Sequence, residues 1–218
     1  MKVVHAADLH IDSPLRGLDR AALLLLAGDI YDGSWRDYET GLFFARQMSR
    51  LRAAGVGVVM VRGNHDAESS IATLRSKGYD YWALGHVHTR EVIETDPWIV
   101  FPGNLQGRNV NETGAKGATV VTIEGGAVTS VKHVPLDVVR FCVCAIDATE
   151  AESGHDVVER TRTALNKALA EANGRTLAAR LVVTGQSRAH AALVGDPERW
   201  TAEIRAAAID ACGDEVWI

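Results

Sequence analysis

Short apolar runs that stop at glycine and polar residues constrain the fold of this chain more than any other feature. The clearest run, residues 22–27, is uninterrupted and ends at Gly28 and Asp29. A run of this kind is typical of a strand buried on both faces, as in a parallel sheet covered by helices. The same pattern recurs over residues 3–7, 57–61 and 79–84.

A helix is predicted between the second and third runs. Residues 35–53 carry apolar side chains near helical spacing, among them Leu42, Phe43 and Leu51. Strands that alternate with helices indicate an α/β sandwich around a largely parallel sheet. We therefore expect α/β architecture in the first part of the chain.

The pattern changes between residues 91 and 135. Gly125 and Gly126 separate two alternating runs, which is typical of a β-hairpin. This part is therefore predicted to be antiparallel, with strands over residues 92–93, 98–101, 118–123 and 127–134.

A second change near residues 135–137 marks a predicted domain boundary. Beyond it we expect, in order, a strand, a helix, a strand, a helix and a terminal strand, over residues 139–146, 156–172, 177–184, 197–208 and 215–218. The predicted domains are a large one over residues 1–137 and a small α/β one over residues 138–218, which suits a chain of 218 residues.

Charge and cysteine content narrow the function classes. No apolar run reaches the roughly 20 residues needed to span a bilayer, and the start has no secretory pattern. Three cysteines are too few for a disulfide framework, so we expect reduced thiols in the cytoplasm. The net charge of -5 argues against tight, unaided binding of nucleic acid. It does not exclude a nucleic-acid substrate if bound metal ions add positive charge.

Polar blocks follow the four predicted strands. In open α/β sheets, ligands bind beyond the carboxyl ends of the strands. Each of the first three blocks alone is more often a turn or loop, and for the fourth alone the two readings are about equal, but four blocks that converge on one edge favour a functional site. The blocks are Asp8-Leu9-His10, Gly28-Asp29, Gly63-Asn64-His65-Asp66 and Gly85-His86-Val87-His88.

The residue types in these blocks suit divalent metal ions. Asp8 and His10 lie two positions apart, so both side chains leave the same face of an extended segment, as do His86 and His88. Mixed carboxylate, imidazole and amide ligands favour Mn²⁺, Fe²⁺ or Zn²⁺ over Ca²⁺. The metal candidates are Asp8, His10, Asp29, Asn64, His86 and His88.

The blocks resemble those of the calcineurin-like metallophosphoesterases. More narrowly, the chain resembles the SbcD-type DNA repair exonucleases and, among them, YhaO-like proteins. The resemblance implies a four-layer αββα sandwich followed by a small α/β capping domain. The narrower match rests on Asp8–Leu15, Ala27–Gly33, Gly78–His88, Pro102–Arg108, Glu112–Gly114 and Leu136–Arg140.

The same resemblance implies a role for each block. One metal ion would be held by Asp8, His10, Asp29 and His88. The second would be held by Asp29, Asn64 and His86, with Asp29 bridging. His65 would stabilise the transition state or protonate the leaving oxygen, and Asp66 would orient it. Two metal ions about 3.5–4 Å apart can activate a shared water as hydroxide, which then attacks phosphorus in line.

Further residues have two open interpretations. Asp32, Asn104 and Arg108 are candidates for substrate binding, and for each a polar loop without such a role is an equally good reading. His5 is interpreted as a packed strand residue rather than a ligand. Cys142 and Cys144, which share one face of a strand, are interpreted as core thiols.

The chain departs from the family pattern in one respect. The family has a further histidine between the third and fourth blocks, and no histidine lies between Asp66 and Gly85 here. The second metal site therefore lacks one protein ligand. The connections over residues 12–22 and 66–78 are also short for crossovers. Either segments near Leu18–Leu24 and Ser69–Leu74 are missing from the sequence, or the chain is a truncated variant with one metal ion or no activity.

We predict a metal-dependent phosphodiesterase, an SbcD-like DNA exonuclease and endonuclease that uses Mn²⁺. The resemblance implies 3′ to 5′ exonuclease and single-strand endonuclease activity, a homodimer and an SMC-like ATPase of the SbcC kind as partner. Two alternatives stay open. One is a phosphodiesterase or phosphatase for small substrates, and the other is a non-catalytic, partner-binding subunit with a degenerate site.

Overall fold

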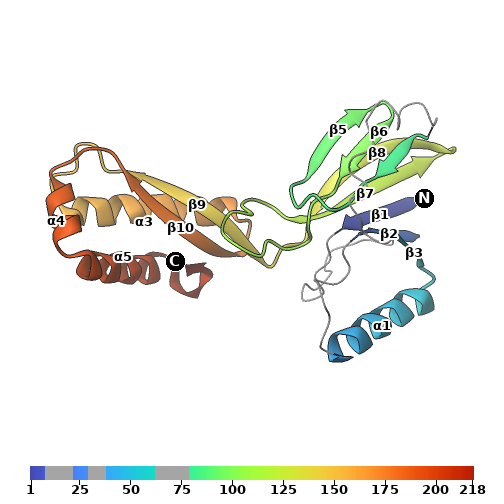
Figure 1. Ribbon diagram of the computed structural model, residues 1–218, viewed down its shortest axis with the longest axis horizontal. Helices are drawn as coiled ribbons and strands as arrows, with labels where there is room; N and C mark the ends of the chain where they lie inside the picture. Colours follow the sequence, from blue (N-terminus) through green and yellow to red (C-terminus); the bar gives the residue numbers. More distant parts are fainter. Residues whose placement is uncertain (8–21, 29–37, 62–78) are drawn as a thin grey trace. The chain divides into compact units, whose positions relative to one another are not determined.

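The computed structural model describes residues 1–7, 22–28, 38–61 and 79–218, which form two compact units. The first unit comprises residues 1–106 and 115–137, and the second comprises residues 107–114 and 138–218. Both combine strands with helices (Figure 1), so the predicted mixed α/β architecture, with a smaller unit after the sandwich, is confirmed.

The main sheet of the first unit has five strands in the order β3-β2-β1-β7-β8. The strands β3, β2 and β1 are parallel to one another. On the other side of β1, β7 pairs antiparallel with it, and β8 pairs antiparallel with β7. The predicted runs and the hairpin are confirmed. The strands are β1 (Lys2–Ala7), β2 (Leu23–Ala27), β3 (Gly57–Val61), β7 (Gly117–Glu124) and β8 (Ala127–Pro135).

The turn between β7 and β8 shows why the local sequence was enough to predict this hairpin. Gly125 and Gly126 have φ angles of 60° and 90°. A two-residue turn with positive φ at both positions matches the right-handed twist of the flanking strands. Glycine adopts such angles without a steric cost, so the sequence Gly-Gly itself specifies the turn.

The fourth predicted strand does not join the largely parallel sheet that the alternation of strands and helices indicated. It forms β4 (Tyr81–Ala83), which does not join β1–β3. It pairs parallel with β6 (Trp98–Phe101), which also pairs antiparallel with β5 (Glu91–Thr95). The physical reason is burial, because β6 carries Ile99 and Val100, which are fully buried at the centre of this second sheet.

The two sheets and one helix form successive layers of the first unit. Val4 and Ala6 of β1 lie in a core cluster with Leu51 of α1 (Tyr38–Ala53) packed against it. His5 alternates to the other face of β1 and bonds to Tyr81 of the second sheet. Figure 1 shows α1 beside β1–β3. The helix predicted over residues 35–53 is confirmed from Tyr38 onward, and its predicted start lies outside the described residues.

The second unit has a three-stranded parallel sheet in the order β11-β10-β9. Every predicted element is present, and one short helix, α4, was not predicted because seven residues show no helical period. The elements are β9 (Val139–Asp147), α3 (Gly154–Glu171), β10 (Thr176–Thr184), α4 (Ala189–Gly195), α5 (Pro197–Cys212), the 3₁₀ helix η2 (Gly213–Glu215) and β11 (Val216–Trp217).

The core of the second unit lies between this sheet and the helices α3 and α5. Leu165 of α3 and Leu177 of β10 are almost fully buried there. Cys142 and Cys144 face the same core with their sulfur atoms 3.6 Å apart, as predicted for core thiols, and the three cysteines are not joined by a disulfide.

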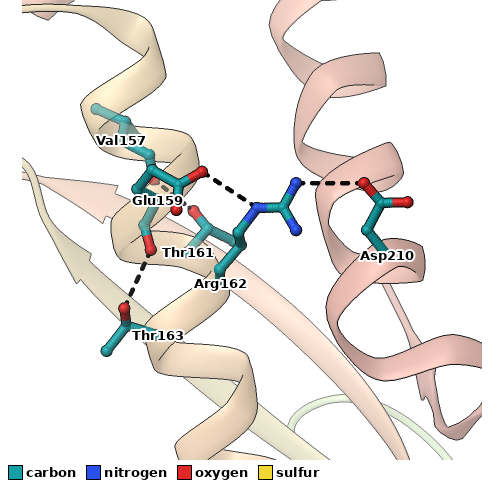
Figure 2. Close-up of polar contacts among 6 residues, drawn as sticks. All are labelled: Val157, Glu159, Thr161, Arg162, Thr163 and Asp210. Atoms are coloured by element: carbon teal, nitrogen blue, oxygen red, sulfur yellow. Dashed lines mark hydrogen bonds and ion pairs between the residues drawn. The ribbon is translucent and has the colours of Figure 1, made fainter.

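A polar contact also joins the helices α3 and α5 of the second unit. Figure 2 shows Arg162 of α3 between Glu159 of its own helix and Asp210 of α5. The ion pairs are 3.2 and 3.3 Å long, and both carboxylates are largely exposed. Exposed pairs of this kind contribute about 0–1 kcal/mol, so apolar burial is the main stabilising term.

In the parts of the chain that the structure describes, no helix is long and apolar enough to cross a membrane.

Candidate active site

The parallel strands of the main sheet end at one edge. Ala7 of β1 pairs with Ala27 of β2, and Ala27 pairs with Val61 of β3. The first two polar blocks begin directly after β1 and β2 in the sequence, and the third begins one residue after the end of β3. Since the carboxyl ends of parallel strands are where ligands bind in α/β folds, this edge is the candidate site.

Most predicted site residues belong to the blocks that follow these strands. These block residues and Asp32 lie outside the described residues, so their roles stay predictions. They are Asp8, His10, Asp29, Asp32, Asn64, His65 and Asp66. The described residues hold the fourth block, which carries His86 and His88, and the two candidates Asn104 and Arg108.

The fourth block is pressed against the end of β2. A β-carbon on Gly85 would overlap the carbonyl oxygen of Ala27 and lie 2.7 Å from its carbonyl carbon. Only glycine permits this approach, and Gly28 and Asp29 follow Ala27 directly in the sequence. The glycine of the block therefore has a steric role, which is to bring the histidine segment to the strand that precedes the predicted bridging carboxylate.

His86 has an unusual backbone conformation. Its φ angle is 81°, in the left-handed region that side chains other than glycine rarely adopt. Conformations of this kind cost about 1–3 kcal/mol and persist where the surrounding structure imposes them, and active sites are among the places where they cluster. The strain at His86 is therefore consistent with its predicted role as a ligand.

His88 is held through its carbonyl oxygen. The backbone N–H of Asn104 donates to it at 3.2 Å, and the ammonium of Lys116 donates to it at 3.0 Å. Gly103, with φ of 76°, allows this approach, since a β-carbon there would lie 3.0 Å from the same oxygen. Asn104 also forms a parallel bridge with Ala7, the last residue of β1. The fourth block is thereby joined to the end of β1 as well as to that of β2.

Asn104 and Arg108 occupy different surroundings. Asn104 is fully buried, and its side-chain amide donates to the carbonyl oxygen of Gln106 at 2.9 Å. Arg108 is exposed and belongs to the second unit, where its backbone N–H donates to the Glu112 carboxylate at 2.9 Å. Substrate binding by either residue stays a prediction.

His5 is a packed residue of β1, as the sequence indicated. Its side chain is fully buried, with Nδ1 2.8 Å from the Tyr81 hydroxyl and Nε2 3.0 Å from the Leu84 carbonyl oxygen. Burial lowers the pKa of His5 to about 4, and the bond to Leu84 only partly opposes this shift. The imidazole is therefore neutral, and both ring nitrogens are already bonded.

Lys116 was not among the residues predicted to belong to the site. No local pattern distinguishes it, because a single lysine between Ala115 and Gly117 is ordinarily a solvated side chain. The structure instead buries it to 7% exposure against the His88 carbonyl, 28 positions earlier in the chain.

The donor set fits a divalent metal centre only if the four blocks are taken together. The described residues contain no group of three or more His, Cys, Asp or Glu side chains that could hold a metal ion. His86 and His88 supply imidazoles, while the metal candidates in the blocks after β1–β3 add two carboxylates, the imidazole of His10 and an amide. These are the donor types that Mn²⁺, Fe²⁺ and Zn²⁺ accept.

Comparison with known proteins gives two matches that together cover the chain. Residues 1–140 match the calcineurin-like phosphoesterases, and residues 141–218 match the middle domain of metallophosphoesterase YhaO. A curated relative is the uncharacterized metallophosphoesterase YhaO of Bacillus subtilis (strain 168). It is 25% identical over 296 residues, which cover 84% of this chain and 71% of the relative.

The length of this match bears on the short connections. The matched stretch of 296 residues exceeds the 218 residues of this chain, so the relative has residues within it that this chain lacks. Members of the family that matches residues 1–140 use divalent metal ions. The family model matches more than half of the chain, and the fourth block packs against the ends of β1 and β2, so this chain belongs to the calcineurin-like phosphoesterase family.

Proposed function

We propose that this protein is an SbcD-like nuclease that hydrolyses phosphodiester bonds in DNA with the help of two divalent metal ions, which we take to be Mn²⁺. The observation that carries the proposal is the packing of the fourth block beside two strand ends. Gly85 lies against Ala27 of β2, and the His88 carbonyl is bonded to Asn104, which bridges Ala7 of β1. That arrangement is the one a metal site shared between the four blocks requires. The choice of DNA rests on the resemblance of the segments around the blocks.

The residues proposed to hold the metal ions are the six candidates of the four blocks. When bound, the metal ions would supply a hydroxide nucleophile and neutralise the phosphate charge. The chain itself would hold the phosphate beneath His65. The His65 imidazole would donate a proton to the leaving oxygen, and the Asp66 carboxylate would orient that imidazole.

The first metal site has four protein ligands in this proposal, Asp8, His10, Asp29 and His88. The second has Asp29, Asn64 and His86 and lacks the further histidine of the family pattern. A second site with fewer protein donors should bind its ion more weakly. Titration of the native protein should therefore give one tight and one weak Mn²⁺ site.

The net charge of -5 suits a subunit that leaves part of the DNA grip to a partner. We therefore propose a homodimer that works with an SMC-like ATPase of the SbcC kind. We further propose that it acts in DNA repair in the cytoplasm, where its thiols would stay reduced.

The test compares two substrates with the same protein. Purified protein with Mn²⁺ is given end-labelled single- and double-stranded oligonucleotides and, separately, a chromogenic phosphodiester, with a chelator as the blank. We expect Mn²⁺-dependent cleavage of DNA. Hydrolysis of the small ester alone would replace the nuclease with a small-substrate phosphodiesterase. Fewer than one bound Mn²⁺ and no hydrolysis would favour the non-catalytic subunit.

The role of His65 has its own test. His65→Ala should lower kcat at least 100-fold, because general acid catalysis contributes about 10²–10⁴-fold, while Mn²⁺ binding should stay unchanged. Turnover retained by this variant would remove the proposed role.

A further inference from the structure

We propose that His5 and Lys116 are positioning residues, which hold the segment from Leu84 to His88 in the conformation that binds metal. Neither residue belongs to the four blocks. The proposal rests on the proposed function in that it needs a metal site at His86 and His88. It concerns metal affinity, so it does not depend on which phosphodiester is the substrate.

His5 holds the beginning of this segment. The Leu84 carbonyl can only accept a hydrogen bond, so His5 Nε2 carries the proton and donates to it at 3.0 Å. The neutral ring then has an acceptor at Nδ1, and the Tyr81 hydroxyl donates to it at 2.8 Å. Burial raises the pKa of Tyr81, which keeps that hydroxyl protonated. One tautomer of His5 thus satisfies both bonds, and it links β1 of the main sheet to β4 of the second sheet.

Lys116 holds the end of the segment. Its ammonium donates to the His88 carbonyl at 3.0 Å while the side chain is almost fully buried. Its own carbonyl accepts from the backbone N–H groups of Leu136 and Asp137, at 2.8 and 3.2 Å. The backbone of Lys116 is therefore fixed at the point from which the side chain reaches. A buried ammonium costs several kcal/mol unless it is hydrogen-bonded, so the bond from Lys116 to the His88 carbonyl is needed to offset the burial of Lys116.

The two bonds bracket the strained residue. The carbonyl groups of Leu84 and His88 lie on either side of His86, whose φ is 81°. A left-handed histidine persists only when its surroundings over-determine the backbone. Contact of Gly85 with Ala27 supplies one constraint, and His5 and Lys116 supply side-chain constraints at the two ends of the segment. They act beside two backbone bonds, from Asn104 N–H to the His88 carbonyl and from Leu84 N–H to the Val100 carbonyl. Without them the backbone at His86 would relax to an ordinary φ and redirect both histidine side chains.

The sign of the Lys116 effect separates positioning from electrostatics. An ammonium beside a metal site repels the metal ion, so removal of its charge alone should strengthen Mn²⁺ binding. Loss of positioning should weaken it. Lys116→Met keeps most of the apolar stem and removes the charge and the donor. We expect Mn²⁺ affinity to fall about tenfold, as for other groups that orient metal ligands, with partial recovery in Lys116→Arg.

His5→Phe tests the other end, since it keeps a buried aromatic ring and removes both hydrogen bonds. We expect the Mn²⁺ dissociation constant to rise about tenfold in this variant too. Val121→Ala is the matched control, because Val121 is a buried residue of β7 that pairs with Val3, away from the carboxyl ends of the strands. It should lower the melting temperature and leave Mn²⁺ affinity unchanged.

The experiment measures Mn²⁺ dissociation constants by calorimetry on the full chain, with circular dichroism and Tm for each variant. Weaker binding in His5→Phe and Lys116→Met, but not in an equally destabilised Val121→Ala, supports the proposal. Unchanged or tighter binding in both variants overturns it. If the native protein binds Mn²⁺ but cleaves no DNA, the nuclease proposal fails. The Mn²⁺ affinities of the variants still decide whether His5 and Lys116 are positioning residues. If the native protein binds no Mn²⁺, both proposals fail.

Discussion

Replacement of Gly85 by alanine tests the close approach of the histidine segment to β2. The added methyl group would overlap the carbonyl oxygen of Ala27 and lie 2.7 Å from its carbonyl carbon. These are backbone atoms of a strand that is paired on both sides, with Ala7 and with Val61, so they cannot move without disturbing two ladders. Relief of the overlap must come from displacement of residues 84–88 or from broken ladder bonds.

The magnitude follows from those two routes. Overpacking in a well-packed interior costs about 1–3 kcal/mol, and each lost backbone hydrogen bond costs about 1 kcal/mol. We therefore expect Gly85→Ala to lower the free energy of unfolding of the first unit by about 2–4 kcal/mol. The φ of Gly85 is not positive, so the cost is one of space and not of backbone conformation.

Gly55 provides the matched comparison. Its φ is 75°, and a β-carbon there would meet nothing within 4 Å. Gly55→Ala should cost only the conformational term of about 1–2 kcal/mol and should not change Mn²⁺ affinity. Urea unfolding followed by circular dichroism, together with Mn²⁺ titration, measures both quantities. A Gly85→Ala protein within 0.5 kcal/mol of the native protein, with native Mn²⁺ affinity, would refute the contact.

The remaining predictions concern His5 and the second unit. Because the pKa of His5 falls from 6.5 to about 4 on folding, the unfolded chain binds more protons between these values, so stability declines as pH falls from 6.5 toward 4. The stability advantage of the native protein over His5→Phe should therefore shrink by about 2 kcal/mol between pH 7 and pH 5, and an equal difference at both pH values would contradict this. Arg162→Met removes the contact to Asp210 and should cost less than about 1 kcal/mol, with the loss diminished in 1 M salt; a larger, salt-independent loss in urea unfolding would argue against an exposed ion pair. Gly154→Ala would force a methyl group into the Trp200 ring and should cost about 1–3 kcal/mol by the same measurement, with no loss being the contrary result.

Local patterns predicted much of the fold because the interactions behind them are local. The run over residues 22–27 reappears as the strand Leu23–Ala27, in which Leu24, Leu26 and Ala27 are buried, and the strand ends before Gly28. The helix from Gly154 begins with a capping box made by Ser153 and Asp156, which lie within four consecutive residues of the chain. In such cases the residues that decide the structure are neighbours in the sequence.

The same local patterns did not reveal which sheet β4 joins. Its run ends in glycine like the other three, so the sequence suggested one sheet. The choice depends on β6, which lies about fifteen residues later and offers a fully buried partner strand. Strand pairing is decided by which face can be buried, and a pattern within one strand does not contain that information.

The sequence by itself determined the chemistry of this protein: four polar blocks with carboxylate, imidazole and amide donors, each placed at the end of an apolar run. Only the tertiary structure decided how the fourth block is held. The bonds from His5 to Leu84 and from Lys116 to His88 join residues 79 and 28 positions apart. The left-handed conformation of His86 depends on contacts from other strands as well. Donor types are properties of single residues, whereas the position of a donor depends on which distant segments pack together.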